Sequence, residues 1–337
     1  MRIFSILAAL AGLLGGTAVV GYFGFSQVAH ALLSIGWAGL AAILVYRLAA
    51  TTLLGLCWWL LVVPRRPLPA FVWGRLIRDA AAEVLPLSQI GGFVMGARAA
   101  ALMGVPGAVA IASTVADVTM EALAQGGYTT LGLGILAARH PGNHLIIWMA
   151  LGLAIGLTSL VAFGAMQRHG FGRAARLMAP IVTRCFRAAA VGRLAPVSEA
   201  LRDIWTHGPA LRMAGLLHFA AWIVSAVEAW MALHFMGIGL GLGAVIATES
   251  LIHAIRSVAF AVPNALGIQE GAYILIGGIF GLPPDAALAL SLLKRARDLS
   301  LGVPALLSWQ IAESSRLLAG RPPVAAGWKA ERPTRTE

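Results

Sequence analysis

Long apolar runs, separated by short polar segments, are the feature that most constrains how this chain folds. Residues 3–24, 35–63 and 144–166 are each long and apolar enough to cross a bilayer as a helix, which requires about 20 residues. With 59% hydrophobic and 12% charged residues, the chain is more apolar than soluble domains are. The runs lack the alternation of polar and apolar residues that is typical of barrel strands. We therefore predict an all-α, polytopic membrane protein with roughly seven or eight crossings or part-crossings.

The basic residues predict which segments face the cytoplasm. The formal net charge is +11, and arginines concentrate in residues 167–212 and from Arg316 onward. Because cytoplasmic loops are enriched in Lys and Arg, we expect these segments, and the Arg65-Arg66 pair, on the cytoplasmic side. Both termini are then cytoplasmic, with residues 319–337 as a disordered tail. Binding to nucleic acid is not expected, since no basic fold with interleaved aromatic residues is present.

A weak internal repeat predicts the domain organisation. Four proline, glycine or acidic residues recur after 177 positions. The matching pairs are Pro86 with Pro263, Gly104 with Gly281, Pro106 with Pro283, and Glu121 with Asp298. Since the basic loops give the two copies opposite starting directions, we predict inverted repeats, 35–139 and 212–316, each with a broken or re-entrant helix. Helix 144–166 and the basic segment 167–212 join them within one transmembrane domain, residues 1–318. The alternative is two duplicated halves that pack only as a scaffold.

The first polar stretch, residues 70–98, interrupts the apolar pattern. Its charged residues at helical spacing are Arg75, Arg78, Asp79 and Glu83. Arg75 and Asp79 are expected to pair at i, i+4. Pro86 then predicts a helix break, and Gly91-Gly92 a turn, within a helix that enters from the cytoplasm. An amphipathic helix on the membrane surface is the alternative.

Three further residues of the first half carry charge within apolar sequence. Asp117 and Glu121 lie at i, i+4 and repel, so one is protonated or both meet a cation, for which Arg98 is the candidate. They serve either structural ion pairing or the handling of protons or substrate. Arg47 is the single charge in residues 35–63, and either extends to the membrane surface, pairs with a neighbouring helix, or contacts substrate.

The second polar stretch is the strongest candidate for a functional site. Glu249, His253 and Arg256 follow one face of a helix at i, i+4 and i+7. Charged residues in a membrane require partners or a wet cavity. Two ligands do not complete a metal site, so we expect an ion-paired stripe along a polar cleft and no metal.

The same stretch ends with a second predicted helix break. Pro263 ends the helix, Gly267 allows the turn, and Glu270 is expected at the N-terminus of the next helix.

The last apolar helix carries charges deep within it. Lys294 and Asp298 are expected to pair at i, i+4, and Arg297 lies between them. Lys294 and Asp298 occupy the positions that Asp117 and Glu121 hold in the first copy. Pro304 is expected to kink or end this helix.

These residues resemble a known family. The run from Pro263 to Gly271, the stripe from Glu249 to Arg256, and the charged segment 294–298 are similar to a flippase-like family related to the transmembrane region of lysylphosphatidylglycerol synthase. The resemblance covers about residues 5–318. Residues 85–98 resemble the branch associated with bacterial hopanoid biosynthesis. Relatives carry a large aminoacyl-transferring domain, whereas only a short tail follows Arg316, so aminoacylation is not expected.

The resemblance implies lipid handling in a bacterial inner membrane. We expect a lipid flippase, scramblase or transporter acting on a hopanoid or a phospholipid, without a cofactor. The alternatives are an intramembrane lipid-modifying enzyme, for which no catalytic motif is visible, and a scaffold that holds hopanoid-pathway enzymes. The residues predicted to bind substrate are Arg78, Glu83, Pro86, Arg98, Asp117, Glu121, Glu249, Arg256, Pro263, Gly267, Glu270, Lys294, Arg297 and Asp298.

Overall fold

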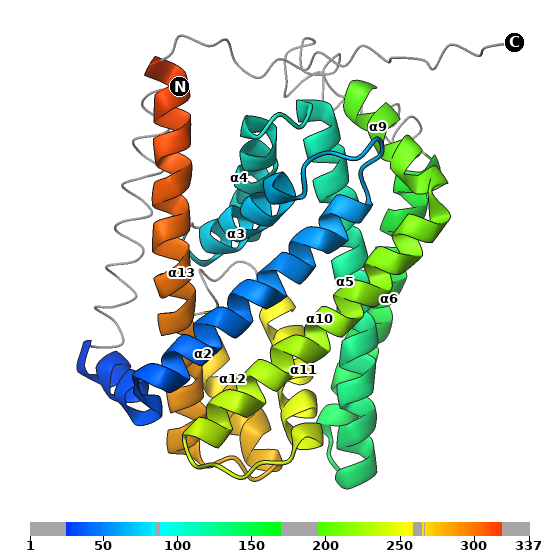
Figure 1. Ribbon diagram of the computed structural model, residues 1–337. Helices are drawn as coiled ribbons and strands as arrows, with labels where there is room; N and C mark the ends of the chain where they lie inside the picture. The colour runs from blue at the N-terminus through cyan, green and yellow to red at the C-terminus, as the bar shows by residue number, and fades with distance from the viewer. Residues whose placement is uncertain (1–24, 85–87, 170–194, 259–264, 266, 319–337) are drawn as a thin grey trace, which may run out of the picture.

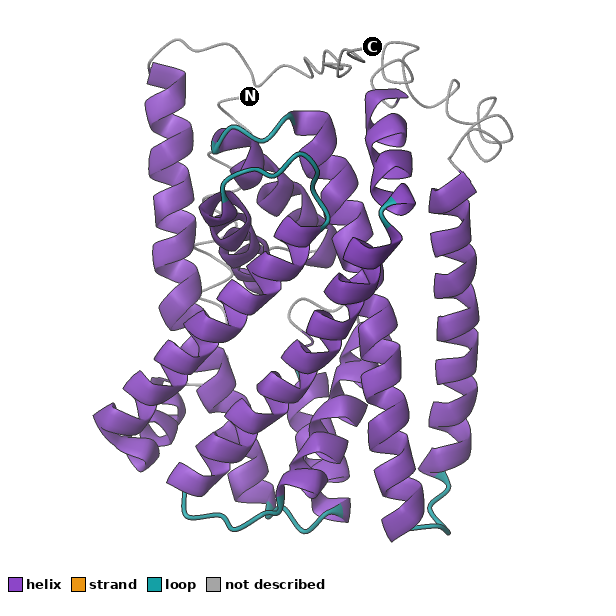
Figure 2. Ribbon diagram, turned by 45° about the vertical axis from the view of Figure 1, so that its right-hand side comes forward, coloured by secondary structure: helices purple, strands orange, loops and turns teal. Residues whose placement is uncertain are grey.

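The described part of the chain is almost wholly helical. A computed structural model describes residues 25–84, 88–169, 195–258, 265 and 267–318 (Figure 1). Within these residues it contains ten helices and no strand, as Figure 2 shows, which confirms the predicted all-α architecture. The predicted first helix, residues 3–24, lies outside the described residues. So do Pro86, Pro263, residues 170–194 of the basic segment, and the tail.

Four of the helices are long and apolar enough to cross a membrane. They are residues 35–60 of α2 (Phe25–Leu60), α5 (Gly107–Arg139), α6 (Leu145–His169) and α10 (Gly208–Phe235). The apolar side chains of α6, such as Trp148, are largely exposed, as in a helix surrounded by lipid. The prediction of a polytopic helical membrane protein is confirmed.

Two pairs of shorter helices form hairpins that enter the bundle from opposite ends. The first pair is α3 (Leu68–Val84) and α4 (Ser88–Leu102), and the second is α11 (Leu242–Val258) and α12 (Ile268–Ile279). The loops that flank α3 and α4 lie at the upper end of the bundle in Figure 1, and those that flank α11 and α12 lie at the lower end. Each hairpin therefore returns to the end from which it started.

The helix boundaries repeat along the chain. Shifting α3, α4 and α5 by 177 residues gives 245–261, 265–279 and 284–316, close to α11, α12 and α13 (Pro284–Leu318). Gly104, which precedes α5, and Gly281, which precedes α13, both adopt left-handed φ angles, 91° and 87°. The packing is exchanged between the halves, because α5 packs against α11 and α13 packs against α3. In Figure 1, α5 and α13 run in opposite directions.

A short helix connects the two sets of helices, the first set being α2 to α5 and the second set α10 to α13. α9 (Ala195–Thr206) follows α6 and packs against α5, and α10 begins directly after it at Gly208. Because α10 starts there, its first turn extends into the region that the arginine distribution assigned to the cytoplasm.

One expectation for the helices is wrong, and two of the alternatives that the sequence left open are excluded. The glycines at 91 and 92 do not form a turn, because α4 is helical through both. α3 is not a surface helix, since it packs against α2, α4 and α13. Pro304 does not end the last helix, because α13 continues to Leu318 with the proline inside it. A proline inside a helix removes one backbone hydrogen bond, and packing elsewhere on a long helix tolerates that loss.

The glycines of α4 serve close packing instead. A Cβ on Gly92 would lie 2.6 Å from the carbonyl oxygen of Arg78, and one on Gly96 would lie 2.8 Å from the Cβ of Arg78. Membrane helices approach this closely where small residues face each other. The glycines thus hold α4 against the part of α3 that carries Arg78.

Replacing Gly96 with leucine is expected to force α3 and α4 apart. Overpacking of this kind costs about 1–3 kcal/mol, so the thermal unfolding temperature in detergent should fall. Gly152→Leu on α6 is the matched control, since a Cβ at Gly152 meets no atom within 4 Å. An equal fall in both variants would contradict the packing role of Gly96.

Candidate functional site

A polar cavity of about 370 Å³ lies in the middle of the bundle. Side chains from α2, α3, α4, α5, α10, α11 and α13 line it, so helices from both halves of the chain contribute. Six cations and four carboxylates lie in its wall. They are Arg47, Arg75, Arg78, Arg256, Lys294 and Arg297, with Asp79, Glu83, Glu121 and Asp298. Because such charges are costly in a membrane, the way each one is paired decides what the cavity can bind.

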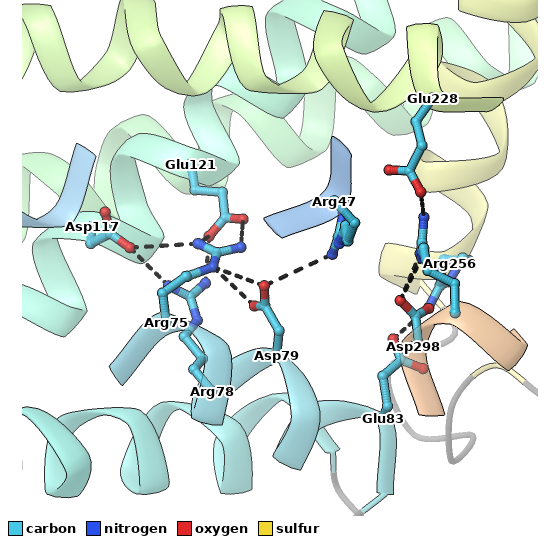
Figure 3. A network of polar contacts seen from close by, with 11 residues as sticks. Arg47, Arg75, Arg78, Asp79, Glu83, Asp117, Glu121, Glu228, Arg256 and Asp298 are labelled. Atoms are coloured by element: carbon cyan, nitrogen blue, oxygen red, sulfur yellow. Dashed lines mark hydrogen bonds and ion pairs between the residues drawn. The ribbon is translucent and has the colours of Figure 1, made fainter. Parts of the chain in front are cut away.

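The first charge cluster joins α3 to α5 (Figure 3). Arg75 donates two hydrogen bonds to Glu121, at 2.8 and 3.0 Å. Arg78 donates to Asp117 at 2.8 Å and also contacts Glu121. Arg75 and Arg78 are each 5% exposed and Asp117 is 0% exposed, so these pairs are desolvated. The arginines of α3 therefore neutralise the two carboxylates of α5.

Two further side chains complete this cluster. Asp79 lies 2.9 Å from Arg75, as its i, i+4 spacing predicted. His218 of α10 places Nε2 2.9 Å from Asp117, so a helix of the second set closes the cluster. The carboxylate of Asp117 is thus held behind the cavity wall by contacts with two other helices, α3 and α10.

The second charge cluster joins α11, α12 and α13. Lys294 donates to Glu249 and, at 2.7 Å, to the hydroxyl of Tyr273. That hydroxyl donates in turn to Glu249 at 2.6 Å. Glu249 is 1% exposed, and it lies behind Lys294 rather than in the cavity wall. In the first cluster the cations are on α3 and the carboxylates on α5. In the second cluster the carboxylate is on α11, which corresponds to α3, and the cation is on α13, which corresponds to α5.

A third group lies at the opposite side of the cavity from Asp117 (Figure 3). Arg297 donates to Glu228 of α10 and to Asp298 at 2.7 Å. Glu228 is 2% exposed and Arg297 is 5% exposed. Arg297 is therefore held by carboxylates on both sides.

Two cations in the wall have weaker partners. Arg47 lies 3.9 Å from Asp79, and Arg256 lies 3.5 Å from Glu83. Their side chains are 20% and 26% exposed, more than those of the other cations in the wall. Glu83 is near the end of α3 and Arg256 near the end of α11, so their contact connects the inner ends of the two hairpins.

Comparison with known proteins places this arrangement in a family. Residues 5–305 match the family described as the lysylphosphatidylglycerol synthase TM region. The chain belongs to this family. No curated protein and no solved structure matches it. The matched residues include both hairpins and every side chain of the cavity wall. The cavity therefore lies within the part of this chain that matches the family.

The structure brings together half of the predicted binding residues of this family member. The predicted residues in the cavity wall are Arg78, Glu83, Glu121, Arg256, Lys294, Arg297 and Asp298. Asp117 and Glu249 lie behind this wall, each in contact with a wall cation. Pro86 and Pro263 are outside the described residues.

Three predicted residues lie elsewhere. Arg98 pairs with Glu313 of α13, at 2.7 Å, and is not the cation that meets Asp117 and Glu121. Gly267 caps α12, with a left-handed φ of 77°. Glu270 accepts a hydrogen bond from the N–H of Gly267 at 2.8 Å, so its predicted place at a helix N-terminus is confirmed. It also pairs with Arg295 at 2.8 Å, away from the cavity wall.

The predicted pair of Lys294 and Asp298 is wrong. Lys294 contacts Glu249 and Asp298 contacts Arg297. Spacing along one helix shows which side chains share a face, but each of these charges has a closer partner that spacing alone does not identify.

Several residues of the cavity region were not among the fourteen residues predicted to bind substrate, although some of them, such as Arg47 and His253, were noted in the sequence. Arg47, Arg75, Asp79, Gln125, His218, Trp222 and His253 line the wall, and Glu228 supports it. His218 and Glu228 carried a usable signal, because polar residues within an apolar span are candidates for function by default. Gln125 and Trp222 carried none, because their roles depend on α11 and α5. Gln125 donates to Ser257 at 2.6 Å, and Trp222 to the carbonyl of Glu121 at 3.4 Å.

Proposed function

We propose that this protein moves lipids between the leaflets of a membrane, as a flippase, scramblase or transporter. The observation that carries the proposal is the charged cavity of about 370 Å³ between the two hairpins. A cavity with ten charged side chains suits a polar headgroup, while exposed apolar helices such as α6 suit contact with acyl chains. Membership in the lysylphosphatidylglycerol synthase TM family supports a role in lipid handling.

The second part of the proposal concerns the two sets of helices. We propose that 35–139 and 212–316 are inverted repeats that rock about the cavity, as in transporters with sites near the bilayer midplane. The repeated boundaries and the exchanged packing of α5 and α13 support this. The C-terminal ends of α2 and α13 lie together with α9 at the upper end in Figure 1, and Arg65, Arg66 and Arg316 are at or next to these ends. By the positive-inside rule, that end is proposed to face the cytoplasm of a bacterial inner membrane, with both termini there.

The lipid is proposed to be a hopanoid or a phospholipid. A lipid-modifying enzyme and a scaffold for hopanoid-pathway enzymes make different predictions in the same experiment. An enzyme would produce a new lipid species that mass spectrometry detects, and a scaffold would leave the rate of lipid movement unchanged.

The test is reconstitution into liposomes with a labelled lipid whose exposure in the outer leaflet is followed by a membrane-impermeant quencher. The wild-type protein is expected to accelerate exchange between leaflets. Ala122→Trp, which adds a ring to the cavity wall, should slow it because the ring occupies space that a headgroup would enter; a roughly tenfold fall corresponds to about 1.4 kcal/mol in the barrier.

The matched control is Ala150→Trp on the exposed face of α6, which should behave as wild type. Exchange in wild-type liposomes at the rate of protein-free liposomes, for both phospholipid and hopanoid probes, would reject lipid movement as the function. Equal rates in the Ala122→Trp and wild-type proteins would reject the cavity as the route.

A further inference from the structure

The cations of the cavity wall fall into two classes by how they are paired. Arg75, Arg78, Lys294 and Arg297 each contact a carboxylate at 2.9 Å or less. Their side chains are between 6% and 11% exposed. These four charges are already neutralised, and a ligand would have to break short, buried contacts to use them.

Arg47 and Arg256 form the other class. Within 4 Å, in the described part of the chain, Arg47 pairs only with Asp79, at 3.9 Å, and Asp79 is bound more closely by Arg75, at 2.9 Å. Asp298 also attracts Arg47 and Arg256 electrostatically, but its ion pair is with Arg297, at 2.7 Å. Arg256 has Glu83 as its carboxylate partner, at 3.5 Å, the limit of a hydrogen bond. Both guanidinium groups therefore keep most of their donors available inside the cavity.

Their positions allow a shared ligand. Arg47 comes from α2 and Arg256 from α11, and both side chains line the same cavity. Figure 3 shows Arg47 between the Asp117 cluster and the group that contains Arg256. Gln125 and Ser257 also line the wall, but they donate within the protein: Gln125 to Ser257 and to the carbonyl of His253, and Ser257 to the same carbonyl. A planar guanidinium presents paired donors that match the oxygens of a phosphate.

We propose that Arg47 and Arg256 bind the phosphate of a lipid headgroup, and that Glu83 competes with this phosphate for Arg256. The inference rests on the proposed function in taking a lipid as the source of the phosphate. It selects a phospholipid over a hopanoid that has no phosphate. Since Glu83 and Arg256 connect the inner ends of the two hairpins, a phosphate that displaces Glu83 also removes a contact between them.

Equilibrium binding tests the site without any measurement of lipid movement. Isothermal titration calorimetry in detergent micelles would compare dioctanoyl phosphatidic acid, dioctanoylglycerol and inorganic phosphate. Wild-type protein is expected to bind the phosphatidic acid most tightly. Arg47→Gln and Arg256→Gln should each weaken that binding about tenfold or more, as expected for hydrogen bonds to a charged group.

The matched control is Arg98→Gln, since Arg98 is 28% exposed but pairs with Glu313 outside the cavity wall. It should bind phosphatidic acid as the wild type does. Arg47→Lys and Arg256→Lys keep the charge but lose the paired donors, so their affinities should lie between those of the wild-type and glutamine proteins.

Glu83→Gln provides a test that misfolding does not imitate. Removing the competing carboxylate leaves Arg256 free for the phosphate, so affinity for phosphatidic acid should rise several-fold while binding of dioctanoylglycerol stays unchanged. A merely structural role for Glu83 would instead lower or preserve both affinities.

Three results would overturn the proposal. They are equal affinities for phosphatidic acid and dioctanoylglycerol, unchanged binding in both glutamine variants of Arg47 and Arg256, and a weaker affinity in Glu83→Gln. Inorganic phosphate that binds as tightly as the lipid, with the same loss in the variants, would overturn the lipid as its source. Because these measurements record binding alone, a protein that binds phosphatidic acid but moves no lipid would reject the proposed function and leave the phosphate site in place.

Discussion

Replacing Asp117 with alanine is expected to destabilise the folded protein by about 3–5 kcal/mol, the usual cost of removing one partner from a buried ion pair. The carboxylate is 0% exposed and accepts from Arg78 at 2.8 Å, with His218 at 2.9 Å. Its removal leaves both of these groups short of an acceptor in a place that water reaches poorly. Reversible unfolding in mixed micelles, followed by far-ultraviolet circular dichroism, measures the free energy of unfolding.

The control for Asp117→Ala is Arg98→Ala. The pair of Arg98 and Glu313 is 28% and 12% exposed, and an ion pair of this kind contributes about 0–1 kcal/mol. A loss in Asp117→Ala no larger than that in Arg98→Ala would show that the first cluster does not hold α3 and α5 together.

The second large effect is expected at Lys294 and Glu249. Either Lys294→Ala or Glu249→Ala leaves one uncompensated charge among α11, α12 and α13, which should cost about 3–5 kcal/mol. The double alanine variant leaves neither charge. It is therefore expected to be more stable than each single variant, although it has lost more side-chain atoms.

A complete mutant cycle of the same unfolding measurement tests this expectation. The interaction energy between Lys294 and Glu249 should be about 1–3 kcal/mol, and Tyr273→Phe should reduce it because the hydroxyl of Tyr273 contacts both groups. Additive single effects would mean that the two charges are solvated independently.

The fold class was accessible from the sequence for a simple physical reason. Helices that face lipid must be long and apolar, so the run at 144–166 predicted α6, Leu145–His169, to within three residues at each end. The recurrence of Gly104 at Gly281 and of Pro106 at Pro283 also marked the starts of α5 and α13. A left-handed glycine and a proline both interrupt a continuous helix, so a new helix begins after them.

The glycines of α4 were misread because their role depends on another helix. Gly91 and Gly92 are typical of a turn when read alone. In the structure, Gly92 permits the backbone of Arg78 to approach within the space that a side chain would fill. No local pattern distinguishes a glycine that bends the chain from one that admits a neighbour.

The sequence indicated many of the charged residues that line the cavity, but not which of them form ion pairs. Charges within apolar sequence drew attention to Arg78, Glu121, Lys294 and Arg297, all of which line the cavity. Their partners were missed, because the carboxylates that neutralise Lys294 and Arg297 come from α11 and α10. Spacing predicts contacts within a helix, whereas desolvation selects whichever opposite charge packing brings closest.

The sequence by itself determined that the chain is an all-helical membrane protein and that the charges within its apolar runs need partners inside the bundle, because lipid admits neither unpaired backbone nor unpaired charge. Only the tertiary structure decided which charges neutralise each other and which remain weakly paired. Arg47 and Arg98 are both arginines in largely apolar surroundings, yet Arg98 pairs closely with Glu313 and Arg47 faces the cavity with a shared partner. That difference arises from the crossing of helices distant in the chain, and it is the basis of the proposed phosphate site.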